Sequence, residues 1–308
     1  MIDKDVVKQL NHKAAKLGIG TNKVGGHNLF DGLNDQDGYD LVKEALDSNI
    51  QMIDTAFMYG LGRSEEIIGD VLQNYPRENF KIATKAAQDP NHDLKINNTP
   101  AFLTQAVDDA LTRLKTDYID LFYIHFPDDD TDDTPKDEAV AALTKLKQAG
   151  KIKAVGVSNF SLEQIKEANK DGGVDFVEDH YNLVDREAET KLWPYLKENN
   201  IQFVPYFPLA SGLLTGKYQP EDSSKFKQFS VEQFRKIMTG IDVVKQIASS
   251  HQATVAQIVL AWYIKNPDIA VVIPGARKPQ QVADNAATLK VDLTDDDYQT
   301  IDRVFSGI

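Results

Sequence analysis

Residues 118–157, YIDLFYIHFPDDDTDDTPKDEAVAALTKLKQAGKIKAVGV, contain two short apolar segments separated by a helical pattern. Tyr118–His125 and Ile152–Val157 are apolar without a clean alternation, which is typical of strands covered on both faces. Between them, Pro135–Ala149 has the periodicity of an amphipathic helix, and Gly150 follows it as a C′ glycine that ends a helix. This stretch therefore predicts one strand–helix–strand unit of a parallel sheet.

The same alternation continues on both sides of this unit. Six further strands are expected, at Leu17–Thr21, Ile50–Asp54, Phe80–Thr84, Val174–Val177, Phe203–Tyr206 and Ile269–Ile273. Further helices are expected at Gly38–Ser48, Ser64–Asn74, Thr99–Leu114, Leu162–Asn169, Glu187–Asn199, Val231–Ser250 and Val255–Lys265. Helix starts are indicated by Ser64, which precedes two glutamates, and by Ser161, which has the capping-box spacing to Gln164.

Eight strand–helix units are the number found in a closed (β/α)8 barrel, the TIM barrel of the α/β class, which takes about 250 residues plus insertions. The chain has 308 residues and no Pro/Gly/Ser-rich linker, so we expect a single barrel domain over residues 1–308.

A doubly wound sheet is the rival fold, and it would need a glycine-rich fingerprint after its first strand. Residues 60–65, GLGRSE, have a glutamate at the third glycine position and no strand immediately before them. Residues 212–218, GLLTGKY, are one residue short of a P-loop and lack the Ser or Thr after the lysine. Neither segment supports a nucleotide-binding fold of another type.

The composition excludes several kinds of function. A net charge of −13 argues against nucleic acid as a partner. The absence of cysteine excludes disulfides, thiolate zinc sites and a cysteine nucleophile. The six histidines, His180 included, form no close ligand pair, so no metal is expected. The polar N-terminus lacks a signal sequence and no apolar run reaches about 18 residues, so we expect a cytoplasmic protein without a membrane segment.

Two acidic runs stand out, one of Asp128, Asp129, Asp130, Asp132 and Asp133 and one of Asp295, Asp296 and Asp297. We interpret them as a solvated loop and a helix N-terminus, where acidic residues are favourable. A cation site is the alternative interpretation.

Polar residues at the carboxyl ends of barrel strands face the mouth where such barrels place their active sites. The expected strands end at or near Asp54, Lys85 and His125, and Tyr59 follows the second strand. Reduction of a carbonyl needs a proton donor, and a tyrosine can serve if a neighbouring ammonium lowers its pKa from about 10. Asp54 would hold Lys85, Lys85 would lower the pKa of Tyr59, and a neutral His125 would orient the carbonyl oxygen.

Six segments of the chain resemble the aldo-keto reductase superfamily in their order and approximate spacing. They are DTAFMYGLGRSEEIIG (54–69), IATK (82–85), LFYIHFP (121–127), IKAVGVSNF (152–160), FVPYFPLASGLLTGKY (203–218) and VVIPGARKPQQVADN (271–285). The resemblance covers about residues 15–305. Several of the segments look most like the subgroup that includes a bacterial inositol-operon oxidoreductase.

The resemblance implies a reductase of aldehydes and ketones with a catalytic tetrad of Asp54, Tyr59, Lys85 and His125. It implies NADP(H) as cofactor in preference to NAD(H), with Arg277, assisted by Lys278, on the 2′-phosphate. The residues implied to contact the cofactor are Gly20, Thr21, Asn22, Asp54, Ser158, Asn159, Glu178, Tyr206, Phe207, Pro208, Leu209, Ala210, Ser211, Gly212, Leu213, Lys217, Gly275, Ala276, Arg277, Gln281 and Asn285. The substrate pocket is expected to include Asn22, Met58, Tyr59, His125 and Phe126, with Tyr123 also at its mouth.

Three positions depart from the pattern. Glu178 stands where the family usually has a glutamine that contacts the nicotinamide carboxamide, and Asn22 stands where many members have a tryptophan. A lysine common near Gly275 is absent, which bears on the preference for NADP(H). Two alternatives remain: a cofactor-binding regulatory subunit, because potassium-channel β subunits share this barrel and tetrad, and a barrel with a decayed site. A small carbonyl compound is the expected partner, and a monomer the expected state.

Overall fold

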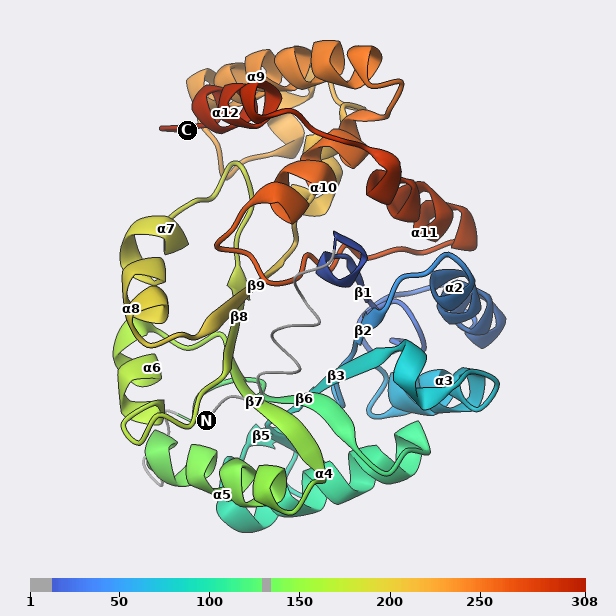
Figure 1. Cartoon of the computed structure of the whole chain (residues 1–308), viewed down its shortest axis with the longest axis vertical. Coiled ribbons are helices and arrows are strands. Elements are labelled where there is room, and N and C mark those ends of the chain that lie inside the picture. Colours follow the sequence, from blue (N-terminus) through green and yellow to red (C-terminus); the bar gives the residue numbers. More distant parts are fainter. Residues whose placement is uncertain (1–12, 129–133) are drawn as a thin grey trace.

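The computed structural model describes residues 13–128 and 134–308. Seven parallel strands form one sheet in the order β1-β2-β3-β6-β7-β8-β9, and Figure 1 shows them as a ring with the helices outside it. The strands are β1 (Gly18–Gly20), β2 (Met52–Asp54), β3 (Lys81–Ala86), β6 (Ile119–Ile124), β7 (Ile152–Ser158), β8 (Phe176–His180) and β9 (Gln202–Tyr206). The expected α/β barrel is confirmed.

The eighth position of the ring is filled by an extended segment rather than by a regular strand, which corrects the strand expected at Ile269–Ile273. Ala270 donates its backbone N–H to Phe203 of β9 (2.9 Å), and Gly18 of β1 donates to Val272 (2.9 Å). Only isolated parallel bridges follow, because Pro274 has no N–H to continue the ladder. The segment nevertheless joins β9 to β1 and closes the barrel.

The helices mostly lie where the sequence predicts them. The main helices are α2 (Asp35–Asp47), α3 (Arg63–Leu72), α4 (Pro100–Leu114), α5 (Lys136–Gln148), α6 (Leu162–Ala168), α9 (Val231–Ser250) and α10 (Val255–Lys265). The helix expected at Glu187–Asn199 is instead two short ones, α7 (Ala188–Lys191) and α8 (Trp193–Glu198). Pro194 explains the break, since a proline removes a backbone donor and is tolerated only in the first turn of a helix.

The helix signals had different outcomes. Ser161 caps α6 in a capping box with Gln164, and Gly150 follows α5 with a φ of 80°, as expected. Ser64 does not start α3. Gly62 is the N-cap, and the buried Ser64 hydroxyl lies 2.9 Å from that of Thr55. The start of α3 is marked by Gly62, whose φ of 97° lies in the left-handed region, and not by a capping serine.

Several elements were not predicted. They are the hairpin β4 (Gln88–Asp89) with β5 (Lys95–Ile96), the helix α11 (Pro279–Ala286), the extent of α12 (Asp295–Val304) beyond its first turn, and the 3-10 turns η1 (Lys13–Lys16), η2 (Arg77–Asn79), η3 (Ala210–Thr215), η4 (Pro220–Lys225) and η5 (Ala287–Lys290). The second acidic run does form a helix N-terminus, the first turn of α12, as expected. Of the first run, residues 129–133 lie outside the described part of the chain.

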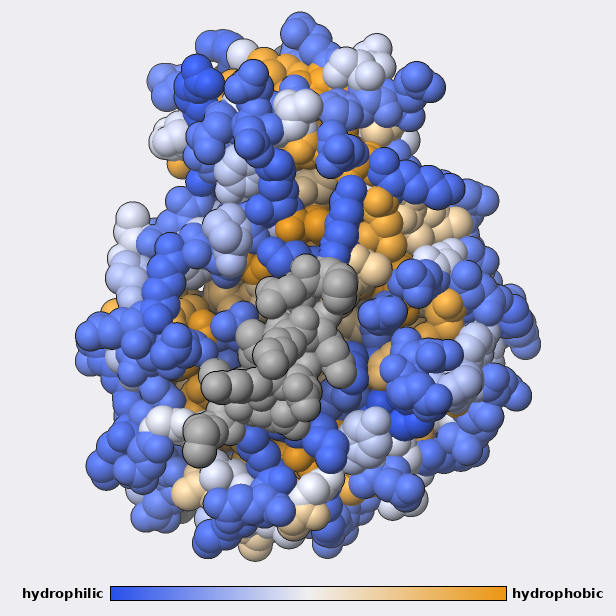
Figure 2. Space-filling model, in the orientation of Figure 1, coloured by the Kyte–Doolittle hydropathy of each residue, from blue (hydrophilic) through white to orange (hydrophobic). Residues whose placement is uncertain are grey.

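The outer surface of the ring carries most of the apolar core. Ile53, Ile82 and Val155 belong to a large buried cluster shared with the surrounding helices. On the face shown in Figure 2, hydrophilic residues cover most of the outer helices, and hydrophobic residues are visible mainly in the recesses between them. Within residues 13–128 and 134–308, no helix has the length and apolar character needed to cross a membrane.

The inside of the barrel is built in layers, because side chains two residues apart on a strand face the same side. A smaller apolar cluster there includes Met52, Ala83, Leu121, Phe176 and Val204. The residues two positions further along the same strands form the next layer toward the carboxyl ends. They are Asp54, Lys85, Tyr123, Glu178 and Tyr206. The apolar layer thus ends where a polar layer begins.

Gly156 of β7 makes room for one of these side chains. A Cβ at Gly156 would lie 2.2 Å from Cδ1 of Tyr123, whose ring is fully buried. Because neighbouring strands fix both backbones, neither residue can move aside cheaply.

We therefore expect Gly156→Ala to lower the free energy of unfolding by about 1–3 kcal/mol through overpacking. Urea unfolding would measure this change. Gly275→Ala is a matched control, because its added Cβ would meet nothing closer than 3.8 Å. In a chain that already carries Tyr123→Leu, Gly156→Ala should cost less stability than it does in the natural chain, because the ring is gone. An equal cost in both backgrounds would contradict the proposed clash.

Candidate active site

A buried ammonium with two carboxyl groups lies at the polar layer of the barrel. Lys85 Nζ donates to Asp54 Oδ1 (2.5 Å) and to the carbonyl of Thr55 (3.0 Å), and it lies 3.3 Å from Glu178 Oε2. The three residues come from β3, β2 and β8, and only 1%, 2% and 3% of Lys85, Asp54 and Glu178 is exposed. A buried charge needs such partners, and Lys85 has them on two sides.

The pKa values of this cluster depend on one another. Burial alone would lower the pKa of Lys85, but Asp54 and Glu178 raise it above its ordinary value, so the lysine is charged. Burial and the nearby Asp54 raise the pKa of Glu178 to about 8, although Lys85 opposes the rise. Burial raises the pKa of Asp54 as well, against the pull of Lys85. The hydrogen bond between the two carboxyl groups opposes the rise for Asp54 and adds to the rise for Glu178. The proton that they share at neutral pH therefore belongs to Glu178.

The segment after β2 brings Tyr59 over this cluster. It stays paired with β3, because the Thr55 and Phe57 amides donate to Ala83 and Lys85 (2.9 Å each). The turn is then completed by Gly60, whose φ of 71° suits glycine and whose N–H is bound by Asn28. Lys85 Nζ lies 5.7 Å from the centroid of the Tyr59 ring.

The expected lowering of the pKa of Tyr59 is wrong for this structure. Burial raises the pKa of Tyr59 to about 12, and the pull of Lys85 in the other direction is opposed by Asp54 and Glu178. Tyr59 is therefore a protonated phenol at neutral pH. The sequence argument counted the ammonium but neither the loss of water nor the second carboxyl group.

His125 lies across from Tyr59, with the two rings edge to face at 6.3 Å between centroids. Burial and the nearby Lys85 lower the pKa of His125 to about 3, so the ring is neutral, as expected. The ring stacks on Phe126 at 4.6 Å, and its Nδ1 has no hydrogen-bond partner among the described residues. A neutral imidazole with an unused nitrogen is suited to bind a polar ligand atom.

The ends of β7 and β9 are joined by Asn159. Its side-chain amide donates to the carbonyl of His125 (3.0 Å) and to the Ser158 hydroxyl (3.1 Å), and its oxygen accepts from Tyr206 (2.8 Å). Asn159 itself has a φ of 63°, and its backbone N–H donates to the carbonyl of Glu178 (3.3 Å). The polar residues predicted on these strands are thus one connected group.

The loop after β9 has an unusual backbone. Phe207, Ala210, Ser211 and Gly212 all have positive φ values, of 55°, 46°, 54° and 94°. Ala210 and Gly212 donate their N–H groups within the loop, to the carbonyls of Phe207 (2.9 Å) and Leu209 (2.8 Å). Left-handed turns of this kind form concave backbone surfaces that can bind an anion. Lys217 points at Gly212, because a Cβ there would lie 2.9 Å from its Nζ. Leu213 is buried in the core, so only its backbone can face a ligand.

The segment Gly275–Asn285 begins beside β1, where Gly275 bridges to Gly20. The Gln281 side chain accepts from the backbone N–H groups of Arg277 (2.8 Å) and Lys278 (3.1 Å). The Arg277 guanidinium donates to the carbonyls of Asp31 (3.0 Å) and Gly32 (3.4 Å), which leaves its charge without a carboxylate among the described residues.

The two basic side chains of this segment, Arg277 and Lys278, therefore differ in whether a carboxylate pairs with them. Lys278 is already paired with Asp37 of α2 at 2.7 Å. Ala276 and Asn285 are buried, so they support the segment from inside.

Three further predicted positions lie beside this segment and β2. Gly20 bridges to Gly275, and Thr21 donates its hydroxyl to the carbonyl of Asp54 (2.8 Å). Asn22 is half-buried, and its Oδ1 lies 3.8 Å from a Cβ built at Gly275. Met58 and Phe126 are partly exposed, as a substrate mouth requires.

The expectation that Tyr123 lines the mouth is wrong. Tyr123 is fully buried inside the barrel, and Lys85 Nζ lies 5.5 Å from the centroid of its ring. It faces inward one layer below His125, which is two residues further along the chain. Two contacts of Lys85 were not expected from the sequence, although Glu178 itself was expected in the cofactor site. Thr55 supplies a carbonyl to Lys85, and Glu178 is a partner of that lysine. Because alternate residues of a strand face the same side, the inward-facing Phe176 predicts that Glu178 also points into the barrel, although it does not predict the contact with Lys85.

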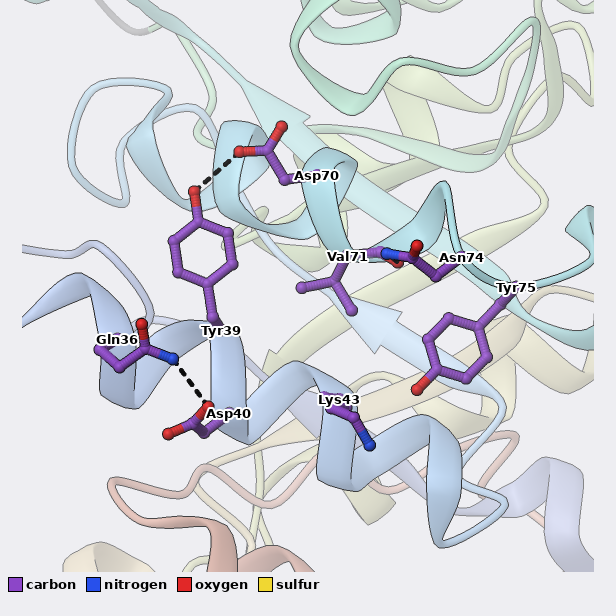
Figure 3. Close-up of a pocket in the computed structure, with 8 residues that line it drawn as sticks. All are labelled: Gln36, Tyr39, Asp40, Lys43, Asp70, Val71, Asn74 and Tyr75. Carbon is purple, nitrogen blue, oxygen red and sulfur yellow. Dashed lines mark hydrogen bonds between the residues drawn. The ribbon is translucent and has the colours of Figure 1, made fainter.

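A groove between α2 and α3 is the rival location for a site. It has a volume of about 510 Å³, and Figure 3 shows its lining side chains. They satisfy one another: Tyr39 donates to Asp70 (2.7 Å), and Gln36 donates to Asp40 (2.9 Å). Nothing there resembles the charged cluster in the barrel. In the described part of the chain, no group of three or more acidic, histidine or cysteine side chains could hold a metal ion.

The raised pKa of Glu178 has a consequence for stability. An unfolded glutamate has a pKa of about 4.3, so between pH 5 and pH 8 the unfolded chain loses this proton while the folded chain keeps it. The folded state then binds more protons, and stability falls as the pH rises.

Glu178→Gln should therefore gain stability relative to the natural chain as the pH rises from 5 to 8, by at most about 1.4 kcal/mol per pH unit. Urea unfolding at several pH values would measure the difference. Glu163→Gln, which changes an exposed glutamate on α6, should give a flat difference. A flat difference for Glu178→Gln as well would contradict the buried proton.

With this geometry established, comparison with known proteins identifies the family. Residues 16–305 match the model described as "Aldo/keto reductase family". The NADH-specific methylglyoxal reductase of Escherichia coli (strain K12) is 33% identical, over 92% of this chain and 92% of that protein.

Two solved structures are similar as well. The glycerol dehydrogenase AKR11B4 from Gluconobacter oxydans has a TM-score of 0.81 and 33% identity, covering 94% of this chain and 91% of that one. An aldo/keto reductase from Klebsiella pneumoniae in complex with NADP and acetate has a TM-score of 0.72 and 27% identity, covering 94% and 91%. These names do not single out the inositol-operon subgroup, which stays a prediction. The chain belongs to the aldo/keto reductase family.

Proposed function

We propose that this protein reduces aldehydes or ketones to alcohols with NADP(H), and that Tyr59 is the proton donor. The observation that carries the proposal is the buried Asp54–Lys85 pair directly beside a protonated Tyr59, with a neutral His125 across from it. This combination supplies a proton donor, a fixed positive charge and an uncharged hydrogen-bonding group at one place.

The residues present fit a nicotinamide cofactor. The left-handed turn from Ala210 to Gly212 forms a concave backbone surface suited to a pyrophosphate, and Lys217 adds a positive charge beside it. Ser158 and Asn159 would hold the carboxamide, and the Tyr206 ring would stack on the nicotinamide. When bound, the cofactor supplies the hydride to the carbonyl carbon.

The protein's own part in the reaction is to deliver the proton. His125 orients the carbonyl oxygen toward Tyr59, whose hydroxyl donates its proton as negative charge develops on that oxygen. Lys85 stabilises the phenolate that remains, because its ammonium is held close to the ring by Asp54. Burial strengthens these interactions, since less water screens them.

Preference for NADP(H) over NAD(H) is supported by the Arg277 guanidinium at the adenosine end, which is bound only by backbone carbonyls among the described residues and suits a 2′-phosphate. One relative is named as NADH-specific and one similar structure contains NADP, so relatives of this chain use both cofactors. Lys278 is held by Asp37 and contributes less to this choice.

Tyr59→Phe should lower turnover by about 10²–10⁴-fold, the usual contribution of a positioned acid, while NADPH still binds. Quenching of tryptophan fluorescence would measure binding, and absorbance of the reduced nicotinamide would measure turnover of 4-nitrobenzaldehyde. Loss of binding together with turnover would contradict the role of Tyr59. Tight binding to the natural chain without any turnover would support a regulatory subunit instead.

Arg277→Ala should weaken NADPH binding by about tenfold and leave NADH binding nearly unchanged, because it removes one charge-assisted contact to the 2′-phosphate. Fluorescence titration with both cofactors would measure the two affinities. Lys278→Ala is the matched control and should have the smaller effect, since Asp37 already occupies that ammonium. Equal weakening of both cofactors by Arg277→Ala would count against the assignment.

A further inference from the structure

Glu178 gives the Asp54–Lys85 pair a second carboxyl group. Its Oε2 lies 3.3 Å from Lys85 Nζ, in an ion pair that is buried on both sides. One ammonium cannot balance two carboxylates in a site that excludes water, so the cluster is neutral only if one carboxyl group keeps a proton.

The position of Glu178 joins this cluster to the groups at the strand ends. Glu178 pairs in register with Ser158 on β7, and its carbonyl accepts from the Asn159 amide. Asn159 in turn accepts from the Tyr206 hydroxyl. Ser158, Asn159 and Tyr206 are the groups that the proposed function assigns to the nicotinamide. The Glu178 carboxyl group is also close enough to Tyr206 and Tyr59 to help raise the pKa of both. It therefore lies near the groups that the proposed function places around the nicotinamide.

We propose that Glu178 is a titratable positioning residue that makes the preference of the site for oxidised over reduced cofactor depend on pH. This proposal rests on the proposed function, because it requires a nicotinamide beside Ser158 and Tyr206. The nicotinamide ring is cationic when oxidised and neutral when reduced. A protonated Glu178 leaves the cluster neutral, whereas an ionised Glu178 gives it a charge of −1, which attracts only the cationic form.

The other titratable groups around Glu178 do not change charge in the same pH range. Burial raises the pKa of Tyr59 and of Tyr206 to about 12, and it raises that of Tyr123 well above its ordinary value. The pKa of His125 is lowered to about 3, and Lys85 stays charged because its two carboxyl partners raise its pKa.

Two carboxyl groups complete this set. Burial raises the pKa of Asp54 against the pull of Lys85, and Asp54 shares a hydrogen bond with Glu178, so these two carboxyl groups titrate as one pair. Asp179, the next residue on β8, also has a pKa raised by burial. Asp179 is therefore the group whose contribution must be separated from that of Glu178.

The first experiment measures the affinities for NADP⁺ and NADPH from pH 6 to pH 9. In the natural chain, the ratio of NADP⁺ affinity to NADPH affinity should rise by about tenfold across this range, the effect of one unit of pKa coupling. The ratio cancels the titration of the 2′-phosphate, which both forms carry. In Glu178→Gln, which keeps the size and the hydrogen bond to Asp54, the ratio should stay flat. In Asp179→Asn, it should rise as in the natural chain.

The second experiment measures protons directly. Calorimetric titration near pH 7.5 in two buffers with different ionisation enthalpies should show that NADP⁺ binding releases a proton and that NADPH binding does not. Glu178→Gln should abolish the release. If both cofactors bind the natural chain with a pH-independent ratio and no proton release, the proposal for Glu178 is overturned while the proposed cofactor function stands. If neither cofactor binds, both fall together.

Discussion

The charge of Lys85, buried inside the barrel just above its apolar layer, determines much of what surrounds it. An ammonium in such a place is costly unless carboxylates and carbonyls replace its water. Asp54 at the end of β2 and Thr55 directly after it do so, and Glu178 does so from β8. Since the three strands are not all neighbours, the barrel must be closed for these groups to meet. The ion cluster and the fold therefore depend on each other.

The same strand is fixed from its other face. Thr84 points outward and donates to Glu65 of α3 (2.6 Å), which also binds Arg113 of α4 (2.7 Å). Glu65 is fully buried, so this second cluster ties α3 and α4 to β3 at the residue next to Lys85. A polar network whose members are all satisfied specifies one arrangement of the helices around the strand. The position of the ammonium is thus set by contacts on both sides of the sheet.

Much of this could be predicted from the sequence, because the signals are local. Asp54, Lys85 and His125 follow apolar strands directly, and the carboxyl ends of parallel strands meet at one edge. Glu178 was placed in the site only by resemblance, since the expected strand stopped at Val177. Its contact with Lys85 spans the barrel, and no local pattern records which inward side chains meet across the centre.

Other features were missed for different physical reasons. The strands of the β4–β5 hairpin have two residues each, too few to show any periodicity. The left-handed backbone at Ala210 and Ser211 uses residues that do not favour it, so their composition gave no sign. The pKa of Tyr59 depends on burial, which a sequence does not measure. Long-range contacts and desolvation are therefore what a single sequence leaves open.

The choice of glutamate rather than glutamine at position 178 has two opposing effects. Glutamine would offer Asp54 a donor that never titrates. A protonated glutamate offers the same hydrogen bond, but it must hold its proton against water over several pH units, which lowers the stability of the folded chain near neutral pH. What glutamate adds is a charge that can appear beside the cofactor site without any movement of the backbone. A buried residue that costs stability and gains a switchable charge is better explained by function than by packing.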